Sequence, residues 1–132
     1  MSRIILMLLL ASVSYGVLAD EWVAVISTGD GGITVYADKS TIRKEGNIVN
    51  IWTLGDFKKA EQISSNIRFL SLKEQYEYDC KEAQMRRLYA TMHSANMGRG
   101  NVVDSRPIHE GWQPVPPDSL NERLWKFACG KK

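Results

Sequence analysis

The C-terminal segment Ser119–Gly130 reads SLNERLWKFACG and carries the clearest structural signal in the chain. Ser119 and Glu122 have the spacing of a capping box, in which the serine hydroxyl accepts the Glu122 backbone N–H and the Glu122 carboxylate accepts the Ser119 N–H. An apolar face follows at helical spacing, made by Leu120, Leu124, Phe127 and Ala128. With Gly130 as the C-cap, the segment predicts a helix of about ten residues.

A helix of this length is marginal in water, so it needs a partner. Cys129 lies near its end. The other cysteine, Cys80, ends a period-two pattern in which Tyr76, Tyr78 and Cys80 alternate with acidic residues. In an exported protein, two cysteines more often form one bridge than two free thiols. We therefore expect a Cys80–Cys129 disulfide that clamps the helix onto a strand. A nucleophilic or metal-binding cysteine is the alternative, but no ligand stands at suitable spacing.

Upstream of the helix, runs of β-branched and aromatic residues alternate with turn residues, a pattern typical of strands. Residues 58–66 are polar and fit either a loop or the widened end of a hairpin. Residues 81–93 also suit a helix by propensity, but the alternation that leads into them favours a strand. We expect strands over residues 22–27, 33–37, 41–44, 48–57, 68–78 and 81–93, and a short edge strand at 102–103.

Glycine, proline and tryptophan add detail to this pattern. Gly55 predicts a bulge or a close approach within its strand. Residues 106–118 contain four prolines, which lack an N–H, so we expect an unpaired extended connection over the surface of the sheet. Trp52 and Trp125 fit the core. The expected fold class is α+β: an antiparallel sheet with a C-terminal helix packed on one face and tethered by a disulfide.

The N-terminus predicts export. Arg3 precedes the apolar run Ile4–Ala11, and Val17 and Ala19 form an A-x-A-like cleavage pattern. We therefore expect residues 1–19 to be a signal peptide. A membrane anchor is the alternative, but polar residues interrupt the run before it reaches the roughly 18 residues that a span needs.

The remainder, residues 20–132, is expected to form one domain. The full sequence is 44% hydrophobic and 24% charged, which excludes a disordered tail, a collagen and a coiled coil. Its net charge of +2 is too small to indicate nucleic-acid binding. Asp20 follows the expected cleavage position, where a lipidated protein has cysteine. We therefore expect a periplasmic or secreted protein with no lipid anchor and no membrane span after cleavage.

No residue pattern predicts catalysis, a metal site or a cofactor. His93 and His109 stand far apart without ligand partners at metal-site spacing. The acidic residues Glu77 and Asp79 share one strand face, where such pairs more often form a solvated surface than a glycosidase dyad. We therefore expect a non-enzymatic protein.

Cationic and aromatic residues are the candidates for binding a protein partner. The arginines could form a patch that meets an acidic partner, although nearby acidic residues also fit an evenly charged surface. Trp112 is a binding candidate if it is exposed and a structural residue if it packs the proline-rich connection onto the sheet. The candidate residues are Arg86, Arg87, Arg99, Arg106 and Trp112.

Several short motifs, in this order along the chain, together resemble the surface-adhesin protein E family of Gram-negative bacteria. They are Tyr36-Ala37-Asp38, Trp52-Thr53-Leu54, Glu77-Tyr78-Asp79-Cys80, Met97-Gly98, Trp112–Ser119, and Leu124-Trp125 with Cys129. The resemblance implies an antiparallel sheet of about six strands and a C-terminal helix bridged through the positions of Cys80 and Cys129.

The resemblance also implies a function. It indicates an exported module that binds host extracellular-matrix proteins such as vitronectin and laminin, and that forms a homodimer. We expect the contact through the sheet surface or the loop Ala95–Asn101. The alternative is a periplasmic envelope-maintenance factor, or an inhibitor that inserts the Arg99 loop into an enzyme such as a lysozyme.

Overall fold

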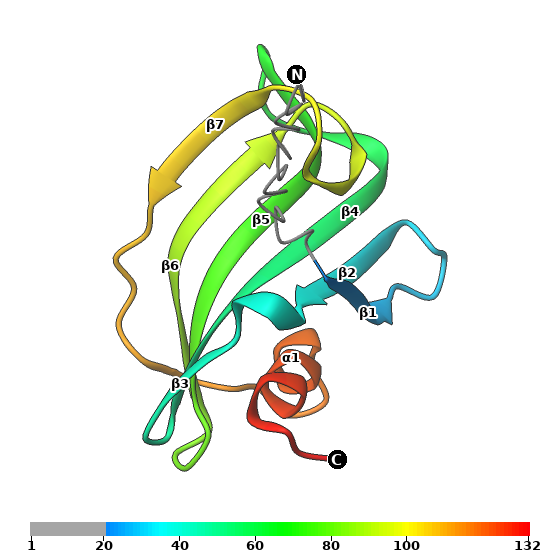
Figure 1. Ribbon diagram of the computed structural model, residues 1–132. Coiled ribbons are helices and arrows are strands. Elements are labelled where there is room, and N and C mark those ends of the chain that lie inside the picture. The colour runs from blue at the N-terminus through cyan, green and yellow to red at the C-terminus, as the bar shows by residue number, and fades with distance from the viewer. Residues whose placement is uncertain (1–20) are drawn as a thin grey trace, which may run out of the picture.

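The computed structural model describes residues 21–132, so the expected signal peptide lies outside the described residues. The described chain forms one antiparallel sheet and one helix, which confirms the expected fold class (Figure 1). The strands are β1 (Trp22–Ser27), β2 (Ile33–Asp38), β3 (Arg43–Glu45), β4 (Ile48–Ser64), β5 (Ile67–Asp79), β6 (Gln84–His93), β7 (Val102–Pro107) and β8 (Gln113–Pro114), and the helix is α1 (Leu120–Cys129).

The main path of the sheet runs β1-β2-β4-β5-β6-β7. Its six strands match the number that the resemblance implied, and the short strands β3 and β8 pair with β4 and β6 and raise the total to eight. Two 3-10 turns interrupt the connections, η1 (Lys39–Thr41) and η2 (Asn96–Gly98).

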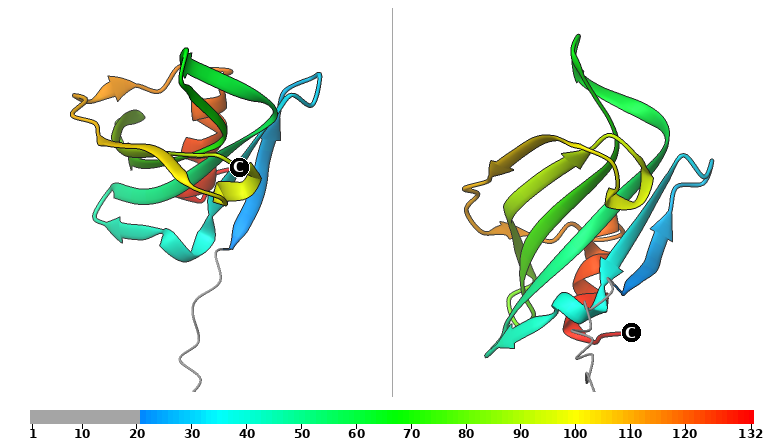
Figure 2. Two further views of the ribbon diagram at one scale, coloured as in Figure 1. Left: turned by 90° about the horizontal axis from the view of Figure 1, so that it is seen from above. Right: turned by 45° about the horizontal axis from the view of Figure 1, so that its top comes forward.

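Strands β4 and β5 form a long hairpin whose tip extends beyond the neighbouring strands (Figure 2). Regular pairing runs as far as Asp56 opposite Ser71, and it resumes at Glu61 opposite Phe69 with extra residues on β4. The polar residues 58–66 are therefore the widened end of a hairpin and not a loop. A bulge or close approach was expected at Gly55, but Gly55 pairs regularly with β2 on one side and β5 on the other. The irregular pairing begins one residue later, after Asp56.

Strand β6 confirms the choice of strand over helix for this segment, although it begins at Gln84 and not at Lys81. The residues before it form a turn that is held by the Asp79 carboxylate. This carboxylate accepts the backbone N–H groups of Lys81 and Glu82, each over 3.0 Å. Because these two N–H groups bond to a side chain, they do not join the sheet ladder.

The prediction of an unpaired proline-rich connection was wrong in part. Pro107 ends β7 opposite Tyr89, and Pro114 lies in β8 opposite Gln84. Both prolines stand on edge strands, where a missing N–H costs no pairing on the outer side. Residues next to them supply the donors, since the N–H groups of Ile108 and Val115 bond to β6 or the turn before it over 2.9 Å.

The core lies between the sheet and α1. Successive strand residues point to opposite faces, so alternate residues of the central strands face the helix. Trp125 packs against this core as expected, whereas Trp52 lies between Ile51 and Thr53 and points to the other face. Leu120, expected on the apolar face of the helix, is 39% exposed. The core residues are Val35, Ala37, Val49, Ile51, Tyr76, Tyr78, Leu124 and Ala128.

The helix begins at the predicted cap. The Ser119 hydroxyl accepts the Glu122 N–H over 3.1 Å, but the reciprocal bond differs from the expected one. Asp118 has a left-handed φ of 56°, and its N–H, in place of that of Ser119, donates to the Glu122 carboxylate over 3.3 Å. Gly130 closes the helix with a φ of 66°, as expected for a C-cap.

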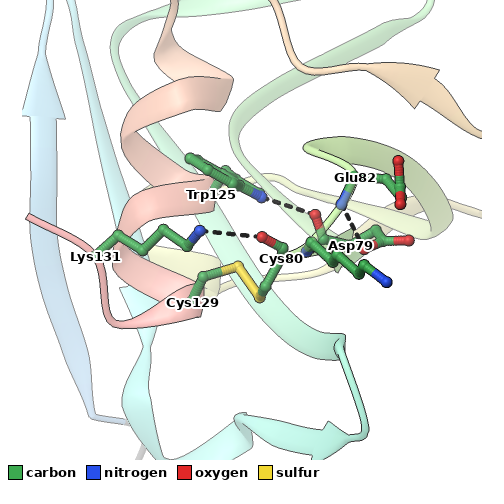
Figure 3. The surroundings of a disulfide bond; sticks show 7 residues. Asp79, Cys80, Glu82, Trp125, Cys129 and Lys131 are labelled. Atoms are coloured by element: carbon green, nitrogen blue, oxygen red, sulfur yellow. Dashed lines mark hydrogen bonds between the residues drawn. A yellow bond between two sulfur atoms is a disulfide. The ribbon is translucent and has the colours of Figure 1, made fainter.

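The Cys80–Cys129 disulfide joins the end of β5 to the last residue of α1, which confirms the predicted clamp. Two hydrogen bonds flank it (Figure 3). The Trp125 indole N–H donates to the carbonyl oxygen of Asp79 over 2.9 Å, and the Lys131 ammonium donates to that of Cys80 over 3.1 Å. The C-terminal end of the helix is therefore attached to the sheet by one covalent bond and two polar contacts.

Candidate binding face

The face of the sheet opposite α1, here called the open face, carries a hollow of about 430 Å³. It lies over β2, β4, β5 and β6, and β1 and η1 add to its wall. We call it the tryptophan hollow, and its lining residues are Trp22, Asp38, Thr41, Trp52, Lys73, Thr91 and His93. Cavities of this size are typical of sites that hold one small group or ligand.

Two indole rings form the apolar wall of the hollow. Trp22 is the first residue of β1, and Trp52 is supplied by the middle of β4. Both side chains are half-buried. The ring of Tyr89 meets that of Trp52 edge-on, with centroids 6.2 Å apart. Tyr89 thus supports the Trp52 ring, and both indole rings stay accessible from outside.

Asp38 has a structural role in this wall. It is only 1% exposed, and its Oδ1 accepts hydrogen bonds from the N–H of Glu21, the N–H of Ser40 and the Ser40 hydroxyl. These three donors satisfy the oxygen and hold the turn η1 at the end of β2. Asp38 therefore supports the wall of the hollow, and its Oδ1 is already occupied by these three hydrogen bonds.

His93 lies at the β6 side of the hollow and is 6% exposed. Its Nε2 shares a hydrogen bond of 2.8 Å with the Thr91 hydroxyl. Its Nδ1 is the one buried side-chain nitrogen or oxygen within residues 21–132 that has no hydrogen-bond partner. Burial, assisted by the charge of Lys73, lowers the pKa of this imidazole below its ordinary value.

Lys73 supplies the positive charge of the hollow. It lies on β5 opposite Leu54 and Thr91, and its ammonium is 5.9 Å from the centroid of the Trp22 ring. Across the described part of the chain, this ammonium makes no ion pair and no hydrogen bond. The hollow therefore combines two indole rings, the Asp38 carboxylate and an ammonium that has no ion-pair partner among the described residues.

The loop Ala95–Asn101 folds onto the open face beside Lys73. The Ser71 hydroxyl donates to the Ala95 carbonyl oxygen over 2.6 Å and accepts the Gly98 N–H over 2.9 Å. Gly98 has a φ of 69°, and a Cβ there would meet Cε at the flexible end of the Lys73 side chain. The left-handed φ favours glycine, and a larger residue would also have to displace Lys73, so the loop lies against this side chain at the edge of the hollow.

Asp56 and Asn96 anchor the same loop. The Asp56 Oδ1 accepts the Met97 N–H over 2.9 Å and the Asn96 side-chain amide over 3.0 Å. Arg99 follows at the exposed end of the loop, and its side chain makes no ion pair with any described residue. The loop is thus a held structure that presents a free guanidinium.

The structure separates the arginines that were predicted to form one patch. Arg86 faces the open side and pairs with Glu77, with nitrogen–oxygen distances of 2.9 and 3.0 Å. Its guanidinium carbon lies 4.4 Å from the centroid of the half-buried Trp112 ring. Arg87 points to the helix side, because neighbouring strand residues face opposite ways. Their shared role in binding stays a prediction.

Arg87 and Arg106 are both engaged within the chain. The Arg87 guanidinium donates to Glu110 at 2.5 Å and to Glu74 at 3.0 Å, and its bond to Glu110 is the main reason that the pKa of Arg87 is raised. Arg106, on the edge strand β7, pairs with Asp104 of the same strand. These two arginines are held by acidic neighbours, whereas Arg99 is not.

Sequence reasoning missed the residues that line the hollow. Trp22, Lys73 and Thr91 lie on three different strands, so their proximity depends on strand order and register. A period-two count along β4 does assign Trp52 and Ile51 to opposite faces, and this signal was available from the sequence.

Within residues 21–132, no cluster of potential metal ligands occurs, and the helices there include none with the length and hydropathy of a membrane span.

The comparisons with known proteins give a family and, separately, a fold. The family model described as surface-adhesin protein E matches residues 22–130. A search of curated proteins found no match. Two solved structures of protein E from Haemophilus influenzae are similar to the chain. The one in crystal form II has 12% identity and a TM-score of 0.60, and the alignment covers 83% of this chain and 95% of that chain.

The other has 11% identity and a TM-score of 0.62, and the alignment covers 83% of each chain. At this level of identity, the structural likeness shows the fold alone.

Proposed function

The chain belongs to the surface-adhesin protein E family, and we propose that it acts as an adhesin. In this proposal it is an exported module that binds another protein and has no catalytic activity. Residues 1–19 would direct export and be removed, and residues 20–132 would act as one binding domain. The partner proposed here is a host extracellular-matrix protein, bound on the open face.

The observation that carries this proposal is the tryptophan hollow. Half-buried Trp22 and Trp52 lie on one accessible face, next to an anchored loop, and the Trp52 ring is supported by Tyr89. Tryptophan, tyrosine and arginine dominate the residues that contribute most to protein–protein binding, because they bury much surface and lose little conformational freedom. Here Trp52, Tyr89 and Arg99 supply all three residue types on the open face.

Location is the first part of the test. Cells expressing the full sequence with a C-terminal tag would be treated with protease before fractionation. Degradation in intact cells is the result expected for a surface-displayed adhesin. Complete protection, with release only after the outer membrane is opened, would contradict surface display and leave a periplasmic partner.

Binding is the second part. The purified protein would be tested against immobilised vitronectin and laminin, with Trp52→Ala, Trp112→Ala and Ile63→Ala compared with the wild type. We expect Trp52→Ala to weaken binding by about tenfold or more. Ile63 is 45% exposed on the distant hairpin end, so its variant serves as the control. An effect limited to Trp112→Ala would move the binding surface to the Arg86 region.

One observation favours a second candidate function, inhibition of an envelope enzyme. Arg99 stands exposed at the end of an anchored loop, a geometry suited to insertion into an active-site cleft. Inhibition of lysozyme by the purified protein, abolished in Arg99→Ala, would support this function. Full lysozyme activity at an excess of the protein would exclude this target.

A further inference from the structure

We infer that the tryptophan hollow recognises an acidic side chain of the protein partner together with an apolar side chain next to it in the partner's sequence. Lys73 would bind the carboxylate, and Trp22 and Trp52 would hold the apolar group. This inference rests on the proposed function and specifies the chemistry of the partner.

The charge of the hollow is the first argument. The Lys73 ammonium has no ion pair among the described residues. It lies over the Trp22 ring, and the end of its side chain runs beside the Gly98 backbone. A partly buried ammonium loses hydration and gains from a bound anion. The side chain is thus positioned for a carboxylate that the chain itself does not provide.

Two carboxylates on this side of the sheet, those of Asp38 and Asp56, do not pair with Lys73. Asp38 accepts three hydrogen bonds at Oδ1, and Asp56 accepts two at its Oδ1 from the loop Ala95–Asn101. These donors are neutral and do not cancel the carboxylate charge, but they hold both side chains in contacts of their own, and neither forms an ion pair with Lys73. Arg99, exposed on the same loop, is a second cation without an ion pair among the described residues. Both cations are therefore available to a carboxylate from outside the chain.

The size and the walls of the hollow are the second argument. A volume of about 430 Å³ admits one or two side chains but not a folded element. Indole walls favour an apolar or aromatic group, and the single ammonium favours one acid beside it.

Two blocked peptides test the inference without any matrix protein. They are acetyl-Phe-Glu-amide and acetyl-Phe-Gln-amide, which differ only in the charge of one side chain. The oxidised protein, expressed from the full sequence and labelled with nitrogen-15, would be titrated with each peptide. The indole N–H signals of Trp22 and Trp52 report on the hollow, and that of Trp125 is an internal control.

We expect the glutamate peptide to bind about fivefold more tightly than the glutamine peptide, the ratio typical of one partly exposed charge contact. Lys73→Met removes the charge, keeps a side chain of similar length and should reduce this ratio to about one. Lys59→Met, at an exposed lysine on the hairpin end, should leave the ratio unchanged. Added salt should weaken binding of the glutamate peptide alone.

Three results would overturn the inference. The first is equal binding, or no binding, of the two peptides to the wild type. The second is a preference for glutamate that persists in Lys73→Met. The third is a Lys73-dependent response to heparin but to neither peptide, which would assign the hollow to an acidic polysaccharide.

The failure of the proposed function looks different. If no matrix protein binds but the glutamate peptide does, the partner proposal fails and the chemistry of the hollow stands. If a matrix protein binds equally to the wild type and to Lys73→Met, the partner proposal stands and the role of Lys73 in binding that partner fails.

Discussion

The Trp125 indole N–H donates to the carbonyl oxygen of Asp79 over 2.9 Å, immediately before the disulfide-bonded Cys80. The helix and the strand are thus joined twice within one turn of the helix. Trp125→Phe should remove the hydrogen bond and keep most of the packing. We expect a loss of about 1 kcal/mol in the free energy of unfolding, measured in urea. No loss would show that water replaces the indole without cost.

The disulfide itself should contribute more. It closes a separation of 49 residues, for which loop-closure entropy gives roughly 4 kcal/mol. Cys80→Ala and Cys129→Ala should therefore lower the melting temperature by similar, large amounts under oxidising conditions. Under reducing conditions, the wild type should approach the variants. A wild type no more stable than either variant in the oxidised state would contradict the clamp.

The helix cap predicts a smaller effect. Ser119→Ala removes the acceptor for the Glu122 N–H, which should cost about 1 kcal/mol in stability. Ser119→Asp keeps an acceptor at this position and should retain most of the stability. An alanine variant with an unchanged unfolding midpoint would show that the cap does not stabilise the helix.

Gly98 should be sensitive to the smallest substitution. Its φ of 69° makes Gly98→Ala strained, and the added Cβ would also displace the end of Lys73, so we expect a loss of about 1 kcal/mol or more. Gly111→Ala is the control, because Gly111 has no left-handed φ and no atom within 4 Å of its Cβ position. Equal stability of the two variants, measured by thermal unfolding, would contradict the strain at Gly98.

His93 predicts a pH dependence. Burial and the charge of Lys73 lower its pKa below 6.5, so the unfolded state binds the proton more tightly than the folded state. Its contribution to stability is complete above pH 6.5 and is lost as the pH falls through the lowered pKa.

An NMR titration of the imidazole would test this. It should give a pKa below 6.5 in the wild type and a higher one in Lys73→Met, where burial still acts but the repulsion is gone. A wild-type pKa at or above the ordinary value would contradict this account.

The parts of the fold that were predicted correctly depend on residues close in sequence or on one covalent bond. The cap at Ser119, the closing Gly130 and the Cys80–Cys129 bridge are of this kind. The strands at residues 22–27 and 33–37 also followed from β-branched and aromatic runs bounded by turn residues. In each case the chemistry of a short segment allows one conformation and few alternatives.

Predictions that required strand register were less successful. The prolines Pro107 and Pro114 pair at a sheet edge, which no local rule could distinguish from an unpaired connection. Arg86 and Arg87 are neighbours in sequence but lie on opposite faces, because each strand residue alternates in direction. The proposed arginine patch treated them as neighbours on one surface.

Short segments and one covalent bond were enough to predict the α+β class, the capped C-terminal helix and its disulfide, since turn residues, a capping box and two cysteines act locally or covalently. The candidate site depends instead on how the strands pair. Trp22, Trp52 and Lys73 lie on three strands, and antiparallel pairing brings them to one hollow. A shift of one residue in the register of a strand would send its side chain to the other face, so the candidate surface depends on pairing that is stabilised by the whole sheet.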